Sequence, residues 1–179
     1  MAEARVADIM IGVWELISFK LQSLDDPDAE PIMPHGPRRE DHKGRGIMTA
    51  NGYMGAFVST EKDIIQLPKA DFVANSDEDV ARVARTFSSY CGRLSLSNLE
   101  GLDGLIHTEV ELALNPAWIG GRQTRKFHME RSNGHDYMTL QPVEPMLMTD
   151  GKRYLGTLKW EKLNLPGYGG LLVQEGKTL

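Results

Sequence analysis

The chain has a single cysteine, Cys91, among its 179 residues, so it cannot form an internal disulfide. It also has no Asn-x-Ser/Thr acceptor for N-glycosylation. Its N-terminus lacks the basic start and apolar core of a secretory signal. Together these absences favour a reducing, cytoplasmic compartment.

Long apolar runs and an excess of positive charge are missing as well. No run approaches the roughly 20 apolar residues that a membrane-spanning helix needs. The net charge of −5 provides no large basic surface for a phosphate backbone. We therefore expect neither a membrane nor a nucleic-acid partner.

Motifs for cofactors and metals are absent too. The sequence contains no Gly-rich phosphate loop, dinucleotide fingerprint or nucleophile elbow. Its histidines show no metal-ligand spacing with a carboxylate. We expect no cofactor and no metal site.

Short alternating or apolar segments occupy most of the chain and predict β-strands. The predicted strands are 12–20, 45–50, 53–60, 91–98, 104–114, 123–132, 135–141 and 153–163. Alternation along 12–20 places Trp14, Leu16 and Ser18 on one face. Asn51-Gly52 and Asn133-Gly134 predict hairpins with type I′ turns, in which both turn residues have positive φ. The pattern predicts an all-β fold, an antiparallel up-and-down β-barrel with one or two helices and room for one small ligand.

Two segments interrupt the β pattern. Ser76 can cap a helix whose apolar positions continue to Tyr90. Residues 21–44 contain four prolines and many charges, which predicts a long loop that is either a lid or disordered. We expect one domain over residues 1–179, with a Gly-rich tail, 165–179, that is mobile or pairs with a strand edge through 171–173.

Several residue patterns together resemble the lipocalin-like domain family. They are Gly12-x-Trp14-x-Leu16, Pro34-x-Gly36, Asn51-Gly52-Tyr53-Met54, Tyr90-Cys91-Gly92-Arg93, Pro116-x-Trp118 with Gln123 and Phe127, and Trp160-Glu161-Lys162. The resemblance implies a calycin-type barrel. In fungi and some bacteria, small barrels of this type serve biosynthetic pathways as cofactor-free cyclases or isomerases, including pericyclic ones. The resemblance therefore also implies an activity of this kind. Lys162 stands where the family has its closing arginine, and Thr108 where it tends to have a histidine.

Arg125 is the first candidate for chemistry. Alternation along 123–132 places Arg125 on one face with Phe127 and Met129. A guanidinium inside a barrel must be paired or must meet a ligand. It could bind a carbonyl, enolate or carboxylate. Alternatively it is the structural arginine that stacks on the Trp of the first strand in lipocalin-type barrels.

His107 and Glu109 are the second candidates. Simple alternation along 104–114 sends both to solvent, opposite the apolar face of Ile106, Thr108 and Val110. In the alternative they line the cavity as a general base and the group that orients it.

Aromatic and methionine side chains complete the candidate site, either as ligand contacts or as ordinary wall and core residues. The candidate substrate-binding residues are Trp14, Tyr53, Met54, Tyr90, Trp118, Phe127, Met129, Tyr137, Tyr154 and Trp160.

Three functions fit this pattern. The first is a cofactor-free cyclase or isomerase that acts on a hydrophobic intermediate of secondary metabolism held inside the barrel. The second is a non-catalytic carrier of a small hydrophobic or mixed-polarity molecule. The third is a filled barrel without a ligand. A homodimer is left open by the sequence.

Overall fold

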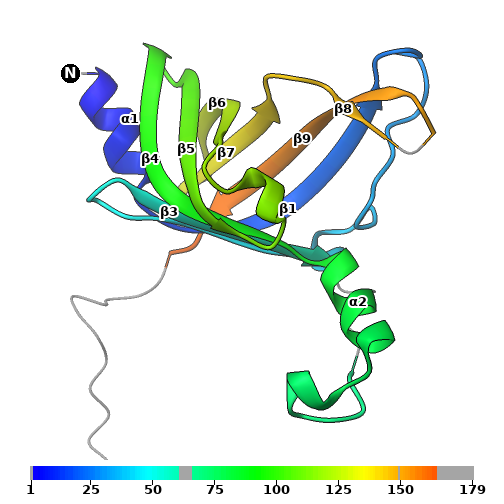
Figure 1. Ribbon diagram of the computed structural model, residues 1–179. Coiled ribbons are helices and arrows are strands. Elements are labelled where there is room, and N and C mark those ends of the chain that lie inside the picture. The colour runs from blue at the N-terminus through cyan, green and yellow to red at the C-terminus, as the bar shows by residue number, and fades with distance from the viewer. Residues whose placement is uncertain (1, 61–65, 149, 165–179) are drawn as a thin grey trace, which may run out of the picture.

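The computed structural model describes residues 2–60, 66–148 and 150–164 (Figure 1). Nine strands form one antiparallel sheet, in the order β1-β2-β3-β4-β5-β6-β7-β9-β8. Their bounds are β1 Gly12–Ser23, β2 His42–Met48, β3 Tyr53–Thr60, β4 Ser88–Glu100, β5 Asp103–Ala113, β6 Arg122–Ser132, β7 His135–Pro142, β8 Met146–Leu147 and β9 Arg153–Lys162. β1 also pairs with β9, so eight strands close into a ring and β8 lies on the edge of β9. The predicted up-and-down barrel is confirmed.

Both predicted hairpins are present, with different turns. Asn133 and Gly134 have φ of 51° and 81°, as a two-residue type I′ turn requires. In the other hairpin only Gly52 has a positive φ, of 74°, and its N–H donates to the Thr49 carbonyl at 3.1 Å. Four residues connect β2 to β3 and Asn51 does not have a positive φ, so the predicted type I′ geometry at Asn51-Gly52 is wrong.

A register shift in β1 changes which side chains point inward. Trp14 and Leu16 are fully buried, as the alternation predicts. The pairing with β9 then shifts between Leu16 and Ser18. A bulge of this kind reverses the alternation that follows it. The predicted inner position of Ser18 is therefore wrong, and Phe19 takes the inner face.

The N-terminal helix α1 (Ala2–Met10) has no counterpart in the sequence prediction. Its residues Val6 and Met10 are 1% and 2% exposed and pack in the core cluster with Trp14. The Trp14 indole donates from Nε1 to the Met10 carbonyl at 2.8 Å. α1 thus fills one end of the barrel.

The predicted helix is α2 (Asp77–Thr86), and its Ser76 cap is confirmed by the Asp79 N–H that donates to the Ser76 side chain. The predicted continuation to Tyr90 is wrong, since β4 begins at Ser88 and Tyr90 pairs with Ala56 of β3. No residue of α2 is buried. Sheet pairing therefore outweighs the helical periodicity in this segment. Neither described helix is long and apolar enough to cross a membrane.

The long loop is shorter at both ends than the predicted 21–44. β1 continues to Ser23 and β2 begins at His42, which leaves 24–41 as the connection. Within it, Ile32 forms a bridge with Leu21, and η1 (Arg39–Asp41) leads into β2. Two further short 3-10 turns are η3 (Phe72–Ala74) and η4 (Pro116–Trp118). The predicted pairing of 171–173 lies outside the described residues.

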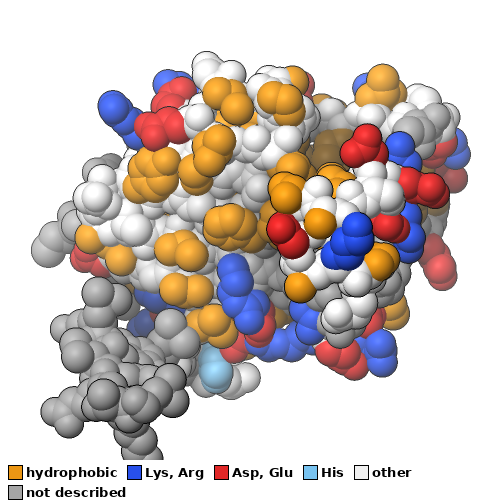
Figure 2. All heavy atoms as spheres, turned by 60° about the horizontal axis from the view of Figure 1, so that its bottom comes forward, with side chains coloured by type: hydrophobic (Ala, Val, Ile, Leu, Met, Phe, Trp, Pro, Cys, Tyr) orange, Lys and Arg blue, Asp and Glu red, His pale blue; other side chains and the backbone are white. Residues whose placement is uncertain are grey.

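Hydrophobic side chains gather over much of the face that Figure 2 turns forward. The strand register places an apolar row on the outer face of the sheet, in which Ile47 neighbours Gly55, Gly55 neighbours Cys91, and Cys91 neighbours Leu112. Ile47 is 40% exposed and Leu112 is 65% exposed. The outer surface of these strands is therefore unusually apolar for a solvent-facing sheet.

Candidate functional site

A cavity of about 340 Å³ lies inside the barrel, away from the end that α1 fills. Its inward-facing strand residues are mostly apolar. They include Phe19, Met48, Met54, Ala56, Val58, Met138, Leu140, Leu158 and Trp160. Its volume falls at the lower end of the range for small-molecule sites. The rest of the wall comes from the junction of α2 with β4, from η4 and from the loop 24–41, which contributes His35.

Arg125 of β6 lines this cavity. Its strand neighbours Phe127 and Met129 are 3% and 2% exposed, so the inner face is the one that the alternation predicts. Within the described part of the chain, Arg125 has no carboxylate or hydrogen-bond partner. A guanidinium without a protein partner faces an apolar space.

The structural alternative for Arg125 was a stack on Trp14. That place belongs to Lys162 of β9, whose Nζ lies 5.8 Å from the centre of the Trp14 ring. The same ammonium donates to the Ile9 carbonyl at 2.7 Å. Burial lowers the pKa of Lys162, and the nearby Asp136 opposes that shift. The cation that packs on Trp14 at this end of the barrel is therefore Lys162, which we call the closing cation.

Trp160 lies in the cavity wall and is 4% exposed. Its indole Nε1–H is buried and has no acceptor among the described groups. A buried donor without an acceptor costs about 1–3 kcal/mol. The nitrogen is itself buried and not exposed in the cavity, so the ring contributes apolar surface to the wall.

His107 and Glu109 do not reach the cavity. They alternate with Ile106, Thr108 and Val110, which are buried on the inner face. His107 contacts the hydroxyls of Ser97 at 2.7 Å and Thr124 at 3.0 Å, both on neighbouring strands. Glu109 pairs with Arg122 at 2.5 Å. The geometry does not support the alternative in which this pair lines the cavity, because the regular register of β5 keeps both residues on the outer face.

The other candidate residues divide into three groups. Met54, Tyr90, Trp118 and Trp160 line the cavity. Trp14, Phe127 and Met129 are buried outside its lining, and Tyr154 is buried with its hydroxyl on Asp150 at 2.9 Å.

Tyr53 and Tyr137 form the third group, on the outside of the barrel. The Tyr53 hydroxyl donates to Glu111 at 3.0 Å, and Tyr137 lies beneath the ammonium of Lys159. These contacts hold both rings away from the cavity.

Most of the lining residues were not among the candidates, and four of them come from irregular parts of the structure. Phe19 reaches the inner face only because of the bulge in β1. His35 comes from the irregular loop and packs edge-on against Phe19, with ring centres 5.2 Å apart. Arg85 and Phe87 line the cavity at the point where α2 ends, which is earlier than predicted. Of these, only Phe87 had a sequence signal, its place on the apolar side of the helix.

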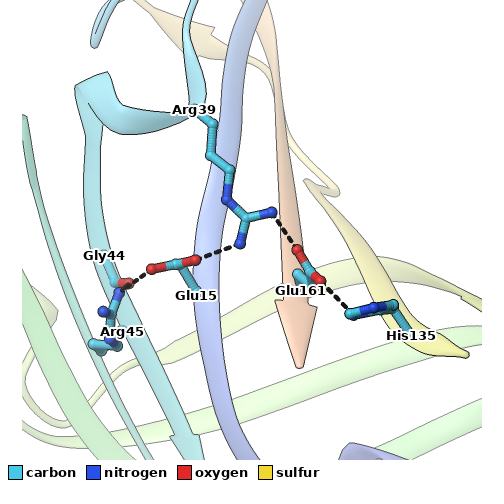
Figure 3. A network of polar contacts seen from close by, with 6 residues as sticks. All are labelled: Glu15, Arg39, Gly44, Arg45, His135 and Glu161. Atoms are coloured by element: carbon cyan, nitrogen blue, oxygen red, sulfur yellow. Dashed lines mark hydrogen bonds and ion pairs between the residues drawn. The ribbon is translucent and has the colours of Figure 1, made fainter. Parts of the chain in front are cut away.

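A polar network holds the loop 24–41 against the outside of the barrel (Figure 3). Arg39 pairs with Glu15 of β1 at 2.5 Å and with Glu161 of β9. Glu161 also contacts His135 at 2.6 Å, and Arg45 lies 3.2 Å from Glu15. The hydrogen bond from Arg39 lowers the pKa of Glu15. We name these five residues the outer clasp.

Among the described residues, no group of three or more His, Cys, Asp or Glu side chains could hold a metal ion. The polar residues in the described lining are Arg125, Arg85, His35, Thr86, Ser88 and Tyr90, within largely apolar walls. A closed antiparallel barrel with an internal apolar cavity defines a small-molecule-binding class of β-barrel. The model of the lipocalin-like domain family matches residues 11–163, and the chain belongs to that family.

Two further similarities were found. The chain is 30% identical over 97 residues to the 4'-hydroxy-3'-methoxypropiophenone carrier protein ppsC of Aspergillus oryzae, a match that covers 52% of this chain and 82% of the relative. A biogenic amine-binding protein of known structure aligns with a TM-score of 0.38 at 10% identity. That alignment covers 84% of this chain and 62% of the other.

Proposed function

We propose that this protein binds a small, largely apolar organic molecule inside the barrel and acts as a carrier in a biosynthetic pathway. The observation that carries the proposal is the cavity of about 340 Å³, with its apolar walls and the unpaired guanidinium of Arg125. Apolar walls with a few polar groups are typical of small-molecule sites. The relative named as a carrier of a propiophenone supports the same function.

The test is to isolate the protein from its native host and extract it with organic solvent for mass spectrometry. A carrier should retain one compound that displaces an apolar fluorescent dye in a one-to-one ratio. Val58→Trp would fill the cavity from β3 and should abolish retention. Val143, which is 39% exposed and does not line the cavity, provides the control Val143→Trp. Failure to recover or bind any apolar compound would refute the carrier.

A cofactor-free cyclase or isomerase is the second candidate. The guanidinium of Arg125 favours it, because it could polarise a substrate carbonyl while the walls hold a reactive conformer. Among the described residues no Asp or Glu lines the cavity, so a pericyclic reaction, which needs no carboxylate base, fits better than proton abstraction. Incubation with extract from a strain that lacks the gene separates the two. Conversion of a metabolite to an isomer of equal mass supports the enzyme, and recovery of an unchanged compound supports the carrier.

The compartment and the assembly remain proposals. The sequence supports a cytoplasmic location. The exposed apolar row that includes Ile47 and Leu112 supports a homodimer, because exposed apolar patches mark contact surfaces. Light scattering of the purified chain and of its Leu112→Lys variant measures the oligomeric state. The variant should reduce the fraction of dimer. A monomer at all concentrations would refute the dimer.

A further inference from the structure

The arginines of this protein divide into two groups by their partners. Most of those whose side chains the structure describes pair with a carboxylate. These are Arg38, Arg39, Arg45, Arg82, Arg93, Arg122, Arg131 and Arg153. The two without a carboxylate or hydrogen-bond partner among the described residues are Arg85 and Arg125. Both line the cavity.

The described lining also lacks negative charge. Of the residues that the structure describes, none of those around the cavity is Asp or Glu, although 25 of the 179 residues of the chain are acidic. The ion pairs of the described residues lie outside the cavity lining, among them the outer clasp and the pair Arg122–Glu109. Although the chain has a net charge of −5, the described lining of its cavity therefore carries positive charge.

Such an interior has a definite chemical preference. The guanidinium of Arg125, which is partly buried among apolar residues, attracts an anionic oxygen, since low local polarity strengthens charge interactions and the planar guanidinium binds carboxylate and related groups well. The exposed side chain of Arg85 adds a second positive charge to the wall of the cavity. A protonated amine would meet two like charges and no carboxylate.

We infer that the ligand is an organic anion, with an apolar body that fills the cavity and one carboxylate, phenolate or enolate group that Arg125 and Arg85 bind. This inference rests on the proposed function, because it requires that the barrel binds a small molecule. It narrows the ligand from any apolar compound to a class defined by its charge.

The experiment compares two dyes with the same carbon skeleton. 8-Anilinonaphthalene-1-sulfonate carries an anionic group, and N-phenyl-1-naphthylamine lacks it. Both are titrated into the full chain at neutral pH with fluorescence detection. The anionic dye should bind about ten-fold or more tightly than the neutral one, as expected for a charge-assisted hydrogen bond. Arg125→Gln should remove most of that difference and leave the affinity for the neutral dye within about two-fold.

Two variants serve as controls. Arg122→Gln makes the same change of net charge on the same strand, but Arg122 pairs with Glu109 outside the barrel, so the preference for the anion should persist. Val58→Trp fills the cavity and should weaken both dyes together. Retained binding of the neutral dye shows that Arg125→Gln is folded.

The outcomes separate the two levels of the argument. Equal affinities for both dyes, with no effect of Arg125→Gln, would overturn the anionic ligand and leave small-molecule binding intact. An equal loss in Arg122→Gln would also overturn it, because net charge would then explain the preference. Binding of neither dye, or binding that Val58→Trp does not weaken, would overturn the proposed function and this inference with it.

Discussion

Replacing Arg39 with methionine should lower the free energy of unfolding by about 2 kcal/mol. Arg39 links the loop 24–41 to Glu15 and Glu161 in the outer clasp. Its pair with Glu15 is partly exposed to water and contributes at most about 1 kcal/mol. Glu161 is 7% exposed, and a buried carboxylate that loses a charged donor costs about 1–3 kcal/mol. Glu161 keeps its contact with His135 when Arg39 is replaced. The free-energy cost of removing the Arg39 donor from Glu161 therefore falls in the lower part of that range.

The assay is urea denaturation at pH 7, with thermal unfolding alongside it. For a chain of this size, about 2 kcal/mol corresponds to a fall in Tm of about 4–8 °C. Arg82→Met is the matched control, because the Arg82 side chain is 53% exposed against 52% for Arg39, but its partner Asp79 lies three residues away on α2. A helix pair of that kind is worth about 0.5 kcal/mol or less. Equal losses in the two variants would refute the reasoning.

The stability of the clasp should also depend on pH. Since Arg39 lowers the pKa of Glu15 below 4.5, the stabilisation is complete above the unfolded pKa and is lost as the pH falls through the lower folded value. The difference between the wild type and Arg39→Met should therefore shrink in acid. A difference that is constant from neutral pH to the acid transition would show that Glu15 takes no part.

Two further predictions concern the barrel wall. His42 is buried, its Nδ1 has no partner among the described groups, and burial lowers its pKa, so the unfolded chain binds a proton first as the pH falls below 6.5. The wild type should therefore lose stability relative to His42→Phe between pH 7.5 and 5 in denaturant titrations, and parallel profiles would contradict this. At Gly92 a Cβ would lie 1.8 Å from the Glu109 carbonyl oxygen, so Gly92→Ala should destabilise by about 3 kcal/mol in the same assay. Gly55→Ala is the control, because its Cβ would meet only ordinary van der Waals contacts. Equal stability of the two variants would contradict the close approach of β5 to Gly92.

The sequence predicted the barrel and much of its inner face because both depend on alternation along regular strands. Along β6 that alternation placed Arg125 and Phe127 inside, and along β5 it favoured the outer position that His107 occupies. Where the strand is irregular, the prediction failed. The bulge after Leu16 exchanged Ser18 for Phe19 on the inner face, and no local pattern signals a register shift that the partner strand imposes.

Long-range contacts account for the rest of what was missed. Arg39 and Glu161 are 122 residues apart in the chain, so no spacing rule connects them. The end of α2 was missed because the pairing of Ser88 and Tyr90 with β3 outweighs a helical periodicity that buries no residue. Both misses reflect tertiary contacts that override local preference.

The identity of the closing cation links the stability of the barrel to its binding chemistry. Lys162 reaches the Trp14 ring from β9 and passes so close to Gly12 that a Cβ there would lie 2.8 Å from its Cε. Gly12 also has a φ of 138°, a conformation that side chains rarely adopt, so glycine meets both demands at this position. With Lys162 over Trp14, the end of the barrel next to α1 is completed without Arg125. Among the described residues no contact retains the guanidinium of Arg125 and no carboxylate lines the cavity beside it, and the proposed anionic ligand would supply that counterion.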